Sequence, residues 1–238
     1  MKIAMWSGPR NLSTAMMYSF GARSDCAVVD EPFYAAYLER TGIQHPMRDD
    51  VLASQTADVD EVVASITGPN PAEKPHFYQK HMTQHMVDGI PRDWMSDVVN
   101  VFLIRHPARV VASFAKKYPD VVETDIGFLQ QLDLFNEVRN LGQEPLVVDS
   151  ADIRENPGVQ LSQLCASLGL DWDPGMLGWP AGGNAADGVW AAHWYDAVHR
   201  STGFAEAEGP LPQLTGRLAE LVETVLPAYN QMASRKIT

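Results

Sequence analysis

The stretch from Lys2 to Met17, KIAMWSGPRNLSTAMM, decides the fold. An apolar run leads into a Gly-Pro turn at 8–9, then into Arg10, and then into Ser13 and Thr14 at the start of an apolar-periodic segment. This order predicts a strand, a loop and a helix. The free N–H groups and the dipole of a helix start attract anions, and a cation and two hydroxyls stand beside them here. The stretch therefore predicts a site for phosphate or sulfate.

The rest of the chain repeats this alternation. Strand candidates lie at Lys2–Ser7, Ala27–Val29, His76–Gln79, Val99–Ile104 and Pro145–Val148. Several of them are short, continuous apolar runs of the kind buried in parallel sheets. Helical patterns lie between them, at Ser13–Arg23, Val59–Ile66, Pro107–Lys117, Ile126–Leu141 and Gly158–Leu168. We predict an α/β fold of the P-loop type, with a doubly wound, mainly parallel sheet flanked by helices. Its ligands are expected outside the carboxyl ends of the strands.

The C-terminal part has a different character. After Leu170 the chain is rich in Gly, Pro and Trp, and it closes with a helical pattern near Leu211–Met232. We interpret residues 171–238 as a lid and a covering helix on the same domain. Residues 1–238 are thus expected to form a single domain, since α/β domains often reach this size.

Composition narrows the function classes. The chain has 18 Lys and Arg against 30 Asp and Glu, a formal net charge of −12. Such a field repels polyanions, so we expect no nucleic-acid partner. The two cysteines, Cys26 and Cys165, lie in apolar runs and are predicted to be buried thiols of a reducing compartment. We expect no signal peptide, no membrane-spanning helix and a cytoplasmic location. The oligomeric state is not predicted.

The opening loop differs from a Walker loop. A Walker motif beginning at Gly8 requires Gly at 13, Lys at 14 and Ser or Thr at 15, whereas this chain has Ser13, Thr14 and Ala15. The missing Lys and the displaced hydroxyl argue against a nucleoside triphosphatase. The plainer interpretation is a surface charge at Arg10 and an ordinary helix cap at Ser13.

A second basic element follows the strand predicted at Val99–Ile104. Arg105 stands at the carboxyl end of that strand, and Ser113 follows eight residues later on the next predicted helix. An Arg fork and a hydroxyl suit one phosphate group. The alternative is an Arg paired with a carboxylate and a Ser packed on the sheet.

Together, the two elements resemble the sulfotransferase family. The segment from Pro9 to Thr14 resembles that family's 5′-phosphosulfate loop, and Arg105 with Ser113 resembles its 3′-phosphate motif, in the same order. The resemblance covers about half of the chain. It implies 3′-phosphoadenosine-5′-phosphosulfate (PAPS) as sulfuryl donor, with no metal expected. The donor would be bound by Arg10, Asn11, Leu12, Ser13, Thr14, Arg105 and Ser113. Asn11 and Leu12 depart from the family's usual Ser and Gly.

Sulfuryl transfer also needs a base for the acceptor hydroxyl and a cation for the leaving phosphate, which Arg10 would supply. Glu31, after the predicted strand Ala27–Val29, resembles the Glu of bacterial and tyrosylprotein sulfotransferases. His81 resembles the base of cytosolic sulfotransferases, with Lys80 adding positive charge. Both candidates for the base stay open, as does the plain alternative that Glu31 pairs with Arg10.

The sequence thus predicts a sulfotransferase that moves a sulfuryl group from PAPS to a hydroxyl of a small acceptor. Phe33, Tyr34, Tyr37, Phe77 and Trp94 are candidates to line an apolar acceptor pocket. One alternative is a P-loop kinase or phosphotransferase that uses ATP. The other is a sulfotransferase-like domain that binds nucleotide without catalysis, an interpretation that Asn11 and Leu12 motivate.

Overall fold

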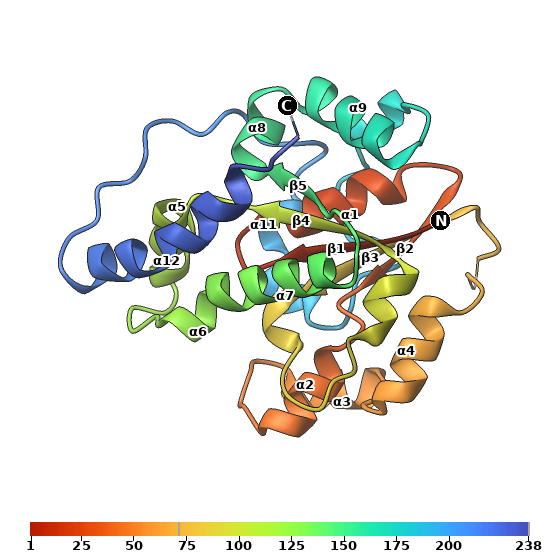
Figure 1. The fold of residues 1–238 in the computed structure, drawn as a ribbon, viewed down its shortest axis with the longest axis horizontal. Coiled ribbons are helices and arrows are strands. Elements are labelled where there is room, and N and C mark those ends of the chain that lie inside the picture. Colours follow the sequence, from red (N-terminus) through yellow and green to blue (C-terminus); the bar gives the residue numbers. More distant parts are fainter. Residues whose placement is uncertain (71, 238) are drawn as a thin grey trace.

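A parallel sheet of five strands forms the centre of the molecule, in the order β2-β3-β1-β4-β5 (Figure 1). The computed structural model describes residues 1–70 and 72–237. The strands are β1 (Lys2–Ser7), β2 (Cys26–Asp30), β3 (His76–Met82), β4 (Val99–Ile104) and β5 (Leu146–Asp149). The sequence predicted all five positions and the parallel arrangement, and both predictions are confirmed. The structure extends β2 and β3 beyond the predicted ends and moves β5 one residue along the chain.

The strand order places a topological switch point at β1. This strand pairs with β3 on one side and β4 on the other, so the chain crosses from one side of β1 to the other between β3 and β4. Ligands of open α/β sheets bind at such a point, outside the carboxyl ends of the strands. The loop that follows Ser7 lies there.

Helices cover both faces of the sheet (Figure 1). They are α1 (Ser13–Gly21), α2 (Tyr34–Thr41), α3 (Arg48–Ser54), α4 (Val59–Thr67), α5 (Pro107–Ala115), α6 (Glu123–Ile126), α7 (Phe128–Asn140), α8 (Ser150–Glu155), α9 (Pro157–Leu168), α10 (Ala191–Trp194), α11 (Asp196–His199) and α12 (Arg217–Ala233). Short 3₁₀ turns are η1 (Thr83–His85), η2 (Asp93–Asp97) and η3 (Pro174–Leu177).

Alternation along β1 shows how the two faces are filled. Ile3 and Met5 point into a core formed with α1 and α9, whereas Ala4 and Trp6 point into a core formed with α4, α7 and the end of α12. Strand side chains alternate between faces, so a continuous apolar run fills both layers. Cys26 and Cys165 are buried free thiols, as predicted.

The structure differs from the predicted helices in three places. The helix predicted over Ile126–Leu141 is divided by Gly127, which has φ of 65° and separates α6 from α7. Five helices were not predicted: α2, α3, α8, α10 and α11. The last helix begins at Arg217, after a long loop that runs outside the helices in Figure 1. None of the helices in residues 1–70 and 72–237 has the length and apolarity needed to span a membrane.

Candidate functional site

The loop between β1 and α1 approaches its neighbours closely and is strained. A Cβ on Gly8 would lie 2.6 Å from the carbonyl oxygen of Ile126, so only glycine fits there. Arg10 and Leu12 have φ of 62° and 70°, in the left-handed region that disfavours side chains. Leu12 stands where the resemblance expects Gly, and its side chain packs partly against the core under α1. This contact offsets part of the strain.

Arg10 joins the two basic elements that the sequence predicted. Its Nε donates to Ser113 Oγ at 2.9 Å, and its carbonyl oxygen accepts from Arg105 Nη1 at 2.6 Å. Desolvation and the nearby charge of Arg105 lower the pKa of the Arg10 guanidinium. Two guanidinium groups that repel each other at a helix start form a place for an anion.

The other loop residues lie at the beginning of α1. The first hydrogen bond of that helix runs from Met16 N to Leu12 O, 3.1 Å, so the N–H groups of Ser13 and Thr14 lie ahead of it. Asn11 is 2% exposed and anchors the loop through Nδ2 to Leu103 O at 3.2 Å. Its Oδ1 is buried without a hydrogen-bond partner in the described chain. The loop is therefore anchored by Asn11, and the first N–H groups of α1 remain free of helix hydrogen bonds.

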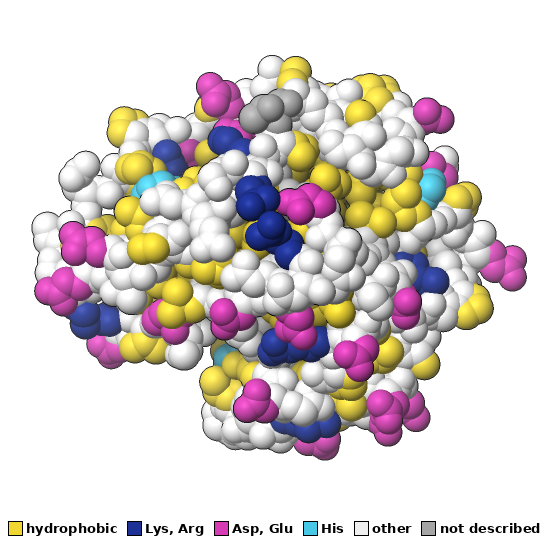
Figure 2. Space-filling model, viewed as in Figure 1, with side chains coloured by type: hydrophobic (Ala, Val, Ile, Leu, Met, Phe, Trp, Pro, Cys, Tyr) yellow, Lys and Arg dark blue, Asp and Glu magenta, His cyan; other side chains and the backbone are white. Residues whose placement is uncertain are grey.

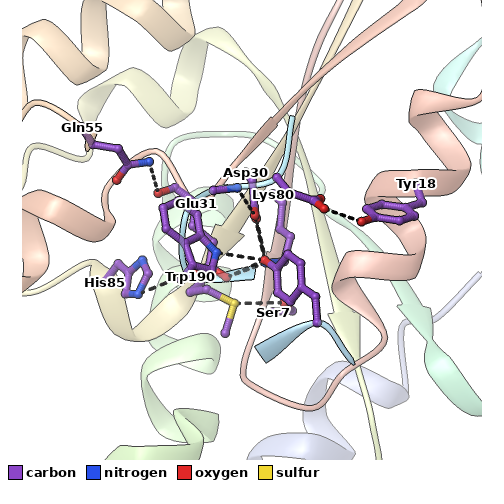
Figure 3. A network of polar contacts seen from close by, with 12 residues as sticks. Ser7, Tyr18, Asp30, Glu31, Gln55, Lys80, His85 and Trp190 are labelled. Atoms are coloured by element: carbon purple, nitrogen blue, oxygen red, sulfur yellow. Dashed lines mark hydrogen bonds and ion pairs between the residues drawn. The ribbon is translucent and has the colours of Figure 1, made fainter. Parts of the chain in front are cut away.

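Glu31 follows β2 and belongs to a buried polar cluster (Figure 3). Lys80 Nζ donates to Glu31 Oε1 at 2.5 Å and to Asp30 Oδ1 at 2.9 Å. Tyr195 OH lies 2.6 Å from Lys80 Nζ and 2.8 Å from Asp30 Oδ2, and Trp190 Nε1 donates to it at 3.1 Å. The C-terminal segment 171–216 thus covers the ends of β2 and β3 with Trp190 and Tyr195.

The charged groups of this cluster shift one another's pKa values. Burial and the charge of Glu31 raise the pKa of Asp30 to about 6, against the opposing effect of Lys80. Burial alone would lower the pKa of Lys80, but its two carboxylate partners raise it. Lys80 is therefore charged at neutral pH, and it fixes one oxygen of Glu31. The pairing of Glu31 with Arg10, the plain alternative of the sequence, does not occur; Lys80 is the partner instead.

The second oxygen of Glu31 faces His85. His85 Nε2 lies 3.8 Å from Glu31 Oε2, and the imidazole stacks on Tyr34 and Tyr37 with centroid distances of 4.6 and 4.9 Å. Glu31 has φ of 43°, a third strained residue at this end of the sheet. His85 was not among the predicted site residues. The sequence offered one signal for His85, its spacing of four residues from His81. In the structure, η1 turns His85 back toward the end of β2.

His81 lies on the other face of the sheet. Its neighbour Lys80 points into the polar cluster, so alternation along β3 turns His81 away from it. The imidazole stacks on Trp6 at 4.6 Å and contacts Phe33 and Trp94, and it is 2% exposed. Burial lowers its pKa to about 3. In this position His81 has a weak proton affinity and does not contact the loop after β1. Phe33 and Trp94, which were predicted to line an acceptor pocket, pack around His81 in the core instead.

Arg105 also belongs to a second cluster, away from Glu31. It pairs with the carboxylate of Glu208, which Arg109 and Arg154 contact as well, at 3.1 and 2.8 Å. Basic side chains are few on the face drawn in Figure 2, where acidic ones are widely spread. A cluster of three arginines around the Glu208 carboxylate is therefore unusual in a chain with a net charge of −12. The sequence predicted Arg105 but neither Arg109 nor Arg154 as its neighbours.

Comparison with known proteins shows which family this chain resembles. The model of the sulfotransferase domain matches residues 1–236. The chain belongs to the sulfotransferase family. This confirms the resemblance stated from the sequence. In the part of the chain that is described, no three His, Cys, Asp or Glu side chains are grouped to hold a metal ion.

Solved sulfotransferases share the fold of this family member. It superposes on the sulfotransferase domain from the curacin biosynthetic pathway with a TM-score of 0.54 and 16% identity, covering 94% of this chain and 96% of that one. A sulfotransferase from Alicyclobacillus acidocaldarius gives a TM-score of 0.55 and 10% identity, covering 98% and 94%.

Two Arabidopsis thaliana relatives of this sulfotransferase-family chain are much longer. Branched-chain-amino-acid aminotransferase-like protein 2 is 35% identical over 229 residues, which are 96% of this chain and 40% of that protein. The corresponding protein 1 is 35% identical over 232 residues, 98% of this chain and 41% of that protein. The chain thus spans about two fifths of the curated relatives that it matches.

Proposed function

We propose that the protein transfers a sulfuryl group from PAPS to a hydroxyl of a small acceptor. The observation that carries this proposal is the joining of the two basic elements: Arg10 donates to Ser113 and accepts from Arg105. A donor with a 5′-phosphosulfate and a 3′-phosphate needs two neighbouring anion sites, and this arrangement supplies two. Family membership supports the same reaction class.

The residues present fit such a donor. The helix start at Ser13 and Thr14 offers N–H groups, which suit the oxygens of a phosphosulfate. Near Arg105, the Glu208 carboxylate already sits among three arginines, so an anion of this kind is stable there. Arg10, Asn11, Leu12, Ser13 and Thr14 would hold the phosphosulfate end, as the resemblance implies. Arg105 and Ser113 would hold the 3′-phosphate.

When bound, the donor supplies the sulfuryl group and a phosphate leaving group. Arg10 stabilises the negative charge that grows on the leaving oxygen. Glu31 accepts the proton of the acceptor hydroxyl, for which Oε2 is the suitable atom, because Lys80 and Tyr195 occupy Oε1. Lys80 holds the carboxylate in place, and Tyr34, Tyr37 and His85 form the adjoining wall. We therefore favour Glu31 over His81 as the base.

Calorimetry separates this function from its alternatives. We expect 3′,5′-ADP to bind more tightly than ATP with Mg²⁺, because the loop lacks the Lys and hydroxyl positions of an ATP site. A preference for ATP would instead indicate a kinase or phosphotransferase. If 3′,5′-ADP binds but no hydroxylated acceptor turns over with labelled PAPS, the domain binds nucleotide without catalysis.

A further inference from the structure

The loop before α12 is mostly exposed but carries one buried carboxylate. Residues 205–210, which we call the strap, run outside the helices (Figure 1). Glu206 and Gly209 are exposed, whereas the side chain of Glu208 is 5% exposed. An acidic side chain is rarely buried unless it is paired. The position of the strap therefore depends on the side chains that pair with Glu208.

Three arginines from separate elements surround Glu208. Arg105 comes from the end of β4 and contacts Oε1 and Oε2. Arg109 on α5 places Nε 3.1 Å from Oε2, and Arg154 on α8 places Nη1 2.8 Å from Oε1. Arg154 Nε also donates to Glu206 O at 2.9 Å, and Arg109 Nη2 donates to Gly209 O. The strap is thus held mainly by cations of the sheet domain.

The charge of this cluster is not balanced. One carboxylate with two oxygens meets three guanidinium groups, whereas a phosphate monoester brings up to two negative charges and three oxygens. Guanidinium forks match phosphate geometry closely. The cluster therefore suits a phosphate better than it suits Glu208.

Arg105 connects this cluster to the loop. Its Nη1 donates to the carbonyl oxygen of Arg10, while its Nη2 and Nε reach Glu208. A phosphate that approaches the Nη2 and Nε side of this guanidinium meets the Glu208 carboxylate, and two anions repel each other there. Occupation of Arg105 by the strap and by a donor is therefore mutually exclusive.

We propose that Glu208 stands in the place of the donor's second phosphate, and that the strap must leave it before the donor binds. Arg109 and Arg154 then bind the same phosphate as Arg105. This inference rests on the proposed function, since it concerns the same donor. It adds two specificity residues, and it makes the strap an internal competitor for phosphorylated nucleotides.

The ionisation of Glu208 is consistent with competition. Partial burial alone would raise its pKa, but the hydrogen bond from Arg105 and the charges of Arg105, Arg109 and Arg154 lower it. The carboxylate is therefore an anion at neutral pH. A neutral side chain of the same shape would compete less.

Calorimetric titration with 3′,5′-ADP and with 5′-AMP tests the proposal. Glu208→Gln is expected to bind 3′,5′-ADP about tenfold more tightly than wild type, because a charge-assisted interaction no longer opposes the ligand. Glu206→Gln, two positions away with an exposed side chain, is the matched control and is expected to keep wild-type affinity. Glu208→Asp keeps the charge on a shorter side chain, and an intermediate affinity is expected.

The arginines are tested in the Glu208→Gln background, where the strap competes least. Adding Arg154→Gln is expected to weaken 3′,5′-ADP about tenfold and to leave 5′-AMP unchanged. Equal or weaker 3′,5′-ADP binding by Glu208→Gln overturns the strap inference, as does an equal loss for both nucleotides with Arg154→Gln. If neither wild type nor any variant binds 3′,5′-ADP, the proposed function itself falls and the inference falls with it.

Discussion

Arg10 Nε lies 2.9 Å from Ser113 Oγ, which ties the loop after β1 to α5 across the end of the sheet. The two residues are far apart in sequence, and each belongs to one of the two basic elements. The contact brings the hydroxyl of one element beside the cation of the other. A ligand that spans both elements would find Arg10 and Ser113 already side by side, so these two side chains need little ordering on binding.

Ser113→Ala tests this contact directly. The hydroxyl is expected to bind the second phosphate and to hold Arg10, so its loss should weaken 3′,5′-ADP about tenfold. Calorimetry gives the affinity. Ser167→Ala on α9, whose exposed hydroxyl bonds to Gln163 O, is the control and should bind as wild type does. Unchanged affinity in Ser113→Ala would remove Ser113 from the donor site.

Arg105→Ala distinguishes the second phosphate from the rest of the nucleotide. We expect a loss of about tenfold to a hundredfold for 3′,5′-ADP and little change for 5′-AMP, because a charge-assisted bond goes to one phosphate only. Arg139→Ala is the control, since this side chain pairs only with Glu144 among the described carboxylates. Equal losses for both ligands would assign Arg105 to the loop fold and not to the phosphate.

Glu31→Gln tests the base. The amide keeps the shape of the side chain but accepts no proton, so the turnover rate with labelled PAPS should fall by about 10²–10⁴. Binding of 3′,5′-ADP should remain, which shows that the donor site is intact. Glu39→Gln, exposed on α2, serves as the matched variant. A full rate in Glu31→Gln would exclude Glu31 and return the question to His85 or to another group.

The sequence located the sheet because most of its strands are buried apolar runs. Such a local pattern can be found without knowledge of the fold. It located Arg105 and Arg10 for the same reason, since Arg105 follows such a run directly and Arg10 follows one after the Gly-Pro turn. It did not find the partners of these residues. Glu208 is 103 residues from Arg105, in a loop with no periodicity. The contact depends on how the C-terminal segment returns over the sheet.

His81 is a second residue whose surroundings the sequence did not reveal. Its type and its place at a strand end suited a base, yet a shift of one position along β3 decides which face a side chain occupies. Lys80 faces Glu31, and His81 therefore faces Trp6. Only the register of β3 against β1, with Trp6 opposite His81, reveals this.

The burial of His81 predicts a pH dependence of stability. An unfolded His has a pKa near 6.5, whereas the pKa of His81 in the fold is about 3. Between these values the unfolded chain binds a proton that the native protein excludes, so the free energy of unfolding falls as the pH falls below 6.5. At pH 5 this residue alone lowers it by about 2 kcal/mol relative to pH 7.

Urea unfolding at pH 7 and pH 5 measures this effect. His81→Phe keeps an aromatic ring among Trp6, Phe33 and Trp94 but cannot bind a proton. It also loses the bond to Gln79 Oε1, at a cost that is the same at both pH values and cancels in the difference. We expect the variant to lose about 2 kcal/mol less than wild type between pH 7 and pH 5. An equal loss in both proteins would mean that His81 is protonated in the fold, and it would reopen His81 as a base.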